Sequence, residues 1–125
     1  MSAARTFDCD PSSIAEARAF VRDSLGGQSE RLLDRAELLV SEIATNCVTH
    51  ARSEFEVAVH RGAVIRVEVR DLDRRMPALG SPSPDDTSGR GLLMVEAVAS
   101  AWGVTPGEDG KSVWFELDAD PQPGD

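Results

Sequence analysis

Two stretches of alternating apolar and polar residues, separated by Arg61-Gly62, constrain the fold of this chain most strongly. Apolar side chains occupy every second position of residues 55–59, and again of residues 65–69. Successive side chains of a β-strand point to opposite faces, so each stretch has one apolar face and one largely polar face. We therefore predict a β-hairpin whose apolar face packs against the rest of the chain.

The other elements follow from helical periodicity, capping residues and breakers. In chain order we expect a short edge strand at 4–9, a helix with Asp10 as N-cap that runs to Leu25, a helix at 29–51, the hairpin, a loop at 74–88, a helix at 91–100, and strands at 102–104 and 112–117. This order predicts an α+β fold: a two-layer sandwich of a mostly antiparallel, mixed sheet with about three helices on one face. Residues 1–118 would form a single domain, followed by an acidic, Pro-rich tail at 119–125.

The net charge and the cysteines restrict the possible binding partners and the cellular compartment of the protein. The 22 acidic and 13 basic residues give a net charge of −9, which argues against binding to nucleic acid or to an anionic membrane. No apolar run approaches the roughly 18 residues that span a bilayer, and the N-terminus lacks a signal-peptide core, so we expect a cytoplasmic protein. Cys9 and Cys47 match no metal-ligand spacing, and we expect both to be reduced and packed.

Glu42, Asn46 and His50 are spaced four residues apart within the second predicted helix. Residues at this spacing project from one flank of a helix. A carboxylate, an amide and an imidazole in a row are suited to holding a metal ion and polarising a hydroxyl. A solvated stripe on an amphipathic helix explains the same pattern equally well.

Three further segments carry groups that suit a ligand. Asp71 closes a strand, where its carboxylate can accept a hydrogen bond from an exocyclic amine of a base. Residues 89–92 (Gly-Arg-Gly-Leu) open a helix, where exposed N–H groups and the helix dipole favour a phosphate. The run Gly110-Lys111-Ser112 leads into the last strand, where the hydroxyl of Ser112 would reach the same cleft. An ordinary strand end and a glycine hinge are the alternative interpretations of the first two.

In order and spacing, these segments resemble the nucleotide-binding boxes of the GHKL ATPase superfamily, from the second helix to the last strand. Residues 39–46 (Leu-Val-Ser-Glu-Ile-Ala-Thr-Asn) and 89–95 (Gly-Arg-Gly-Leu-Leu-Met-Val) look like the small anti-sigma-factor serine/threonine kinases and ATP-binding regulators of actinobacteria. So do Trp102-Gly103-Val104 and residues 111–115. The resemblance implies the Bergerat, or histidine-kinase-like, ATPase fold.

The resemblance also implies roles for individual residues. Glu42 would be the general base, and Asn46 would hold Mg²⁺ against the phosphates of ATP. The remaining implied ligand-binding residues are His50 near the phosphates, Asp71 at the adenine amine, Gly89, Arg90, Gly91 and Leu92 at the triphosphate, and Ser112 near the adenine. The implied partners are an anti-anti-sigma protein of the STAS type and a sigma factor, and the implied assembly is a homodimer.

One box departs from the family pattern Asp-x-Gly-x-Gly, because Asp73 and Arg75 replace the two glycines. Two functions therefore remain open. The first is a regulator that binds ATP and Mg²⁺, phosphorylates a Ser or Thr of its STAS partner, and thereby controls sigma-dependent transcription. The second is a non-catalytic module that sequesters its partner without nucleotide. A detached histidine-kinase catalytic domain is a third and weaker interpretation, since no dimerisation helix with a phosphoacceptor histidine is present.

Overall fold

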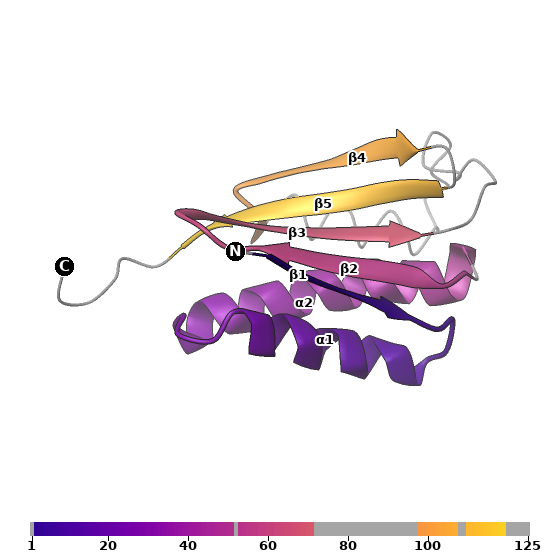
Figure 1. The fold of residues 1–125 in the computed structure, drawn as a ribbon, viewed down its shortest axis with the longest axis horizontal. Coiled ribbons are helices and arrows are strands. Elements are labelled where there is room, and N and C mark those ends of the chain that lie inside the picture. The colour runs from indigo at the N-terminus through magenta and orange to yellow at the C-terminus, as the bar shows by residue number, and fades with distance from the viewer. Residues whose placement is uncertain (1, 52, 72–97, 108–109, 120–125) are drawn as a thin grey trace, which may run out of the picture.

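The computed structural model of the chain describes residues 2–51, 53–71, 98–107 and 110–119. Its elements, in chain order, are β1 (Ser2–Phe7), α1 (Ser12–Ser24), α2 (Glu30–Asn46), a π-helical turn η1 (Cys47–Ala51), β2 (Phe55–His60), β3 (Val64–Asp71), β4 (Ala101–Gly107) and β5 (Gly110–Asp118). The five strands form one sheet in the order β1-β2-β3-β5-β4. Both helices cover the same face of that sheet (Figure 1). The predicted α+β sandwich is confirmed.

The predicted hairpin is confirmed as β2 and β3, which pair antiparallel from Phe55 opposite Asp71 to His60 opposite Arg66. The other three pairings are antiparallel as well, so the described strands contain no parallel pair. β1 begins and ends two residues earlier than predicted. Its bounds follow from its partner, because it pairs with β2 from Ser2 opposite His60 to Phe7 opposite Phe55.

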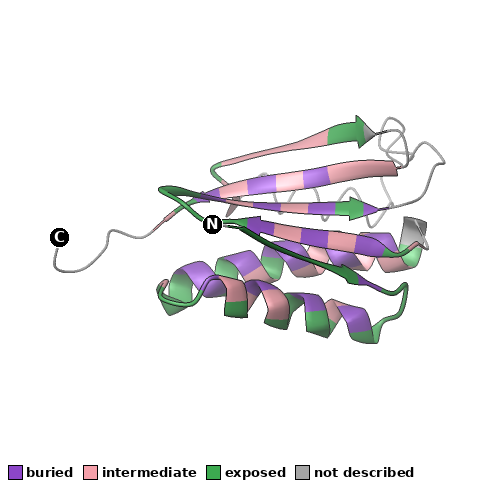
Figure 2. Cartoon of the chain, in the orientation of Figure 1, coloured by how far each residue is buried: buried purple, intermediate pink, exposed green. Residues whose placement is uncertain are grey.

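The core lies between the sheet and the two helices, as the inward band of buried residues in Figure 2 shows. The inward side chains of β2, β3 and β5 are almost completely buried; they are Phe55, Val57, Val59, Ile65, Val67, Val69, Val113, Phe115 and Leu117. On the helical side of the core, α2 contributes seven buried residues: Leu32, Leu33, Ala36, Leu39, Val40, Ile43 and Ala44. The alternation in the strands and the helical period in α2 thus meet in a single apolar layer.

The helix starts follow from local capping. Asp10 accepts a hydrogen bond from the backbone N–H of Ser12 at 2.8 Å, and these contacts with Ser12 lower the pKa of its carboxyl. Pro11 already has helical dihedral angles (φ −55°, ψ −31°), as its ring prefers at a first turn. Ser29 caps α2 by accepting from the N–H of Leu32 at 3.2 Å. The start of α2 is confirmed, whereas α1 begins at Ser12, one residue later than predicted, with Pro11 rather than Asp10 at the N-cap.

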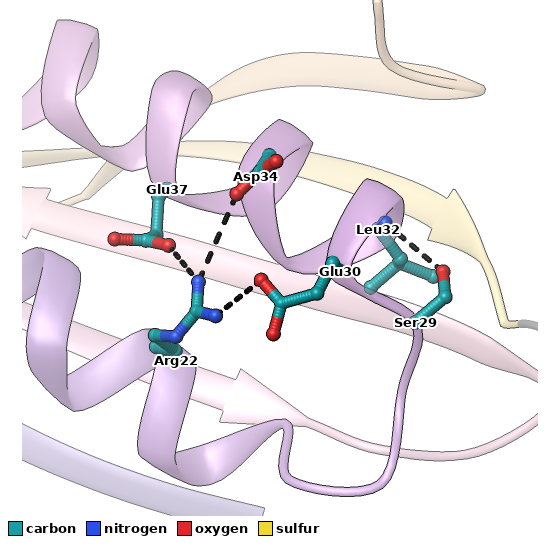
Figure 3. Close-up of polar contacts among 6 residues, drawn as sticks. All are labelled: Arg22, Ser29, Glu30, Leu32, Asp34 and Glu37. Carbon is teal, nitrogen blue, oxygen red and sulfur yellow. Dashed lines mark hydrogen bonds and ion pairs between the residues drawn. The ribbon is translucent and has the colours of Figure 1, made fainter.

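The two helices are tied together by Arg22 of α1, whose guanidinium lies among three carboxylates of α2 (Figure 3). It donates to Glu37 at 2.5 Å and to Glu30, and Asp34 lies 3.8 Å away. The hydrogen bonds with Glu30 and Glu37 raise the pKa of Arg22 above its usual value. Since these groups lie at the surface, they orient the helices more than they stabilise the fold.

The third predicted helix, at 91–100, falls largely on residues 72–97, outside the described residues. The tail at 120–125 also lies outside them. Neither helix of the described part combines the length and the apolar character that crossing a membrane requires.

Candidate functional site

Three chain segments meet at one end of the sheet: the end of β3, the start of β5 and the C-terminal end of α2 (Figure 1). Asp71 is the last residue of β3 and pairs with Lys111 of β5. Cys47, which follows α2 directly, lies near enough to both charges for each to affect the pKa of its thiol. The structure therefore brings Asp71 to the half of α2 that carries Glu42 and Asn46.

Glu42 and Asn46 lie one helical turn apart on α2 and are both half-buried. The neighbours that share their turns, Ile43 and Ala44, are buried in the core. Among the described residues, no side-chain hydrogen bond or ion pair is seen for Glu42 or Asn46. Both side chains carry oxygens and are partly exposed, so they are of a kind that can accept a hydroxyl proton or face a cation.

His50 lies in η1 rather than in the α-helix that the sequence predicted to continue to residue 51. A π-turn closes i→i+5 hydrogen bonds and winds more loosely than an α-helix. Glu42 and Asn46 lie four residues apart within α2, as predicted, and the predicted role of His50 stays a prediction. A π-turn within a helix is itself common at functional sites.

Asp71 is buried at the end of β3, and its side chain is only 3% exposed. The ammonium of Lys111 donates to its Oδ2, and the Lys111 side chain is 15% exposed. A buried carboxylate requires such compensation, because removing it from water without a partner is costly. The group predicted to recognise a base amine is thus already bound by a cation of the chain itself.

Gly110 allows β5 to begin close to the end of β3, beside Asp71. A Cβ atom built on Gly110 would lie 2.0 Å from the carbonyl oxygen of Asp71 and 3.2 Å from its Oδ1. The φ angle of Gly110 is +153°, a value that residues with side chains rarely adopt. Only glycine lets the first residue of β5 lie against the end of β3.

Ser112 lies on the opposite face of the sheet from the other site residues. Side chains alternate along β5, and the buried Val113 and Phe115 fix which face packs on the helices. Lys111 shares the face of Val113, whereas Ser112 points to the side that no described helix covers. The prediction that Ser112 reaches the cleft of Asp71 is corrected by this register, and Lys111 takes its place. The same alternation, continued two residues back from Val113, is the signal that identifies Lys111.

The remaining predicted site residues lie outside the described residues. They are Gly89, Arg90, Gly91 and Leu92, together with the two positions that depart from the family pattern, Asp73 and Arg75. Their predicted roles stay predictions.

If a metal ion binds at this site, most of its ligands would be water and phosphate rather than side chains of the described residues. The described residues contain no group of three or more His, Cys, Asp or Glu side chains placed to hold an ion. Mg²⁺ commonly takes only one or two protein oxygens and completes its shell with water and phosphate. Asn46, one turn after Glu42, is suited to supply one such oxygen.

The two cysteines, both free, differ in their surroundings. Cys47 is buried, and burial together with the charge of Asp71 raises the pKa of its thiol to about 12. Cys9 is exposed and donates to the carbonyl oxygen of Val48 at 3.7 Å. The expectation of reduced cysteines is confirmed, but that of a packed Cys9 is wrong.

At about pH 8, iodoacetamide is expected to alkylate Cys9 in the folded protein and to leave Cys47 unmodified, because thiolate and access are both required. Mass spectrometry would show one adduct, and two in urea. The pKa of the Cys47 thiol in the folded state lies above the ordinary 9.0, so the folded state holds this proton more tightly than the unfolded state does. The resulting stabilisation of the fold is complete below pH 9 and is lost as the pH rises toward 12. Equal alkylation rates for both thiols in the folded protein would contradict the burial of Cys47.

Comparison with known proteins identifies the class of domain. Residues 7–117 match the family model of the histidine kinase-like ATPase domain. The chain belongs to this family, and thus to the GHKL ATPase superfamily that its motifs resemble. No curated protein sequence matches the chain significantly.

Two solved structures share the fold. The first contains the RsbU and RsbW domains of Rv1364c from Mycobacterium tuberculosis; it matches 97% of this chain with a TM-score of 0.74 and 20% identity. The second is the histidine kinase domain of the EL346 blue-light activated histidine kinase from Erythrobacter litoralis, with a TM-score of 0.52 and 22% identity over 90% of this chain. The matches span 33% and 61% of those two chains, so the likeness concerns the ATPase domain fold.

Proposed function

We propose that this chain is an ATP- and Mg²⁺-dependent regulator of the anti-sigma type, which phosphorylates a Ser or Thr of a STAS-type anti-anti-sigma partner and holds a sigma factor when that partner is unavailable. Membership of the ATPase family supports nucleotide binding. Residues 39–46 resemble the anti-sigma-factor kinases, and the structure with an RsbW domain has the same fold. The proposal includes a homodimer in the cytoplasm, as that resemblance implies.

The observation that carries the proposal is the placement of Glu42 and Asn46 on the C-terminal half of α2, which leads to Cys47 and thus toward Asp71. Phosphoryl transfer depends on positioning and charge neutralisation more than on covalent chemistry. In the proposed site the Glu42 carboxylate would accept the proton of the partner's hydroxyl while the hydroxyl oxygen bonds to the γ-phosphorus of ATP and ADP leaves. Asn46 would hold Mg²⁺, which would offset the charge of the phosphates, and Asp71 would lie at the base.

Phosphotransfer tests this function directly. The purified chain, incubated with ATP, Mg²⁺ and a cognate STAS protein, is expected to add one phosphate to a Ser or Thr of the partner, visible by mass spectrometry. Glu42→Ala is expected to lower the rate by about 10²–10⁴-fold, the usual contribution of a general base. Glu37→Ala, on the same helix but bound to Arg22, is the matched control and should leave the rate nearly unchanged.

The absence of transfer by the native chain, or an unchanged rate in Glu42→Ala, would refute the kinase proposal. A second candidate function is then favoured by a specific observation: Lys111 already pairs with the carboxylate expected to recognise the base. In that case the domain would sequester its partner without nucleotide. Calorimetry with ADP and Mg²⁺ separates the two functions, since nucleotide binding that is abolished by Asn46→Ala would reject the non-catalytic module.

A further inference from the structure

The chain contains a single lysine among its 13 basic residues, and it is the residue that binds Asp71. The other basic side chains are arginines, and most of those among the described residues lie at the surface. Lys111 instead is 15% exposed and faces the buried end of β3 through the β3–β5 register. The backbone beside it is also fixed, because Gly110 packs against the carbonyl oxygen of Asp71.

An ammonium and the exocyclic amine of a base require the same kind of acceptor. Each presents N–H donors to a carboxylate oxygen, and the ammonium adds a full charge. Charge-assisted hydrogen bonds are shorter and about twice as strong as neutral ones, and burial strengthens them further. A neutral base amine therefore competes poorly for Oδ2 of Asp71 while Lys111 holds it.

We propose that Lys111 is an internal competitor for the base-recognition carboxylate, and that its displacement from Asp71 accompanies nucleotide binding and sets a low affinity for the nucleotide. This inference rests on the proposed function. Lys111 would weaken nucleotide binding by reducing the fraction of molecules whose Asp71 is available. The observed dissociation constant equals the intrinsic one divided by the fraction of molecules in which Asp71 has released the lysine. The flexible four-carbon stem of lysine permits that release without movement of the backbone.

This role predicts an effect opposite in sign to that of an ordinary phosphate-binding lysine. Removing a cation from a chain with a net charge of −9 should weaken the binding of a polyanion. If Lys111 competes with the base, its removal strengthens binding instead. The sign of the change in affinity thus distinguishes competition from electrostatic support.

The test compares the native chain with Lys111→Met and Lys111→Arg by calorimetry with ADP and Mg²⁺. Lys111→Met keeps the length of the side chain without its charge and is expected to bind about tenfold tighter, since one lost charge-assisted hydrogen bond is of that order. Lys111→Arg keeps a cation beside Asp71 and should bind no more tightly than the native chain does. Arg66→Met is the matched control for loss of a cation: Arg66 lies over Trp114 on the outer face, and its removal should not tighten binding.

A second measurement uses the native protein and does not depend on how the variants fold. With ¹⁵N-lysine labelling the chain has one Nζ resonance, which is expected to move when ADP and Mg²⁺ saturate the site. An unmoved resonance in nucleotide-bound protein, or equal or weaker binding by a folded Lys111→Met, overturns the inference while leaving the proposed nucleotide binding intact. If neither the native chain nor Lys111→Met binds ADP or ATP, the proposed function and this inference both fall.

Discussion

Asp71→Asn and Lys111→Met are each expected to lower the free energy of unfolding by about 3–5 kcal/mol, as removal of one partner from a buried ion pair does. The two side chains are 3% and 15% exposed, so water replaces the lost partner only in part. Asparagine preserves the shape of aspartate and methionine the length of lysine, which keeps changes in packing small. The measurement is urea unfolding monitored by circular dichroism.

The double variant separates the ion pair from the other contacts of Asp71. If the two groups stabilise the fold mainly through each other, the double variant loses markedly less than the sum of the two single losses. Arg66→Met is the control again, because its pairs with Glu68 and Glu116 lie on the half-exposed outer face and should be worth at most about 1 kcal/mol. Additive losses in the double variant would show that Lys111 and Asp71 are not energetically coupled.

Phe115→Ala is expected to destabilise the domain by a similar amount, about 3–5 kcal/mol, through the lost burial and the cavity left behind. Phe115 is completely buried on β5, where it pairs with Val67 of β3 and Trp102 of β4. Its ring therefore fills the core beneath the centre of the sheet. Urea unfolding of the variant checks the value against the total stability of about 5–15 kcal/mol expected for a domain.

Val64→Ala is the matched control for Phe115→Ala. Val64 also lies in a strand but is 44% exposed, so its truncation should cost less than about 1 kcal/mol. Equal losses at the two positions would contradict the placement of the core between the sheet and the helices.

The elements with strong local patterns were predictable from the sequence. The alternation in residues 55–59 and 65–69 predicts β2 and β3 within a residue or two. Asp10, Pro11 and Ser29 predict the helix starts, because capping depends on hydrogen bonds to neighbours in the chain. The end of α2 was harder to predict. The sequence indicates one helix to residue 51, whereas the α-helix ends at Asn46 and a π-helical turn follows. Apolar periodicity over a single turn does not distinguish an α-turn from a π-turn.

The sequence by itself determined the α+β class, the hairpin, the placement of Glu42 and Asn46 on one helical flank, and the position of Asp71 at a strand end. These features depend on contacts within a few residues. The tertiary structure alone decided that β5 inserts between β3 and β4, and hence that Lys111, rather than Ser112, meets Asp71. Asp71 and Lys111, which pair across β3 and β5, are 40 positions apart in the chain. No local rule specifies such a register, because it follows from the burial of whole apolar faces against the two helices.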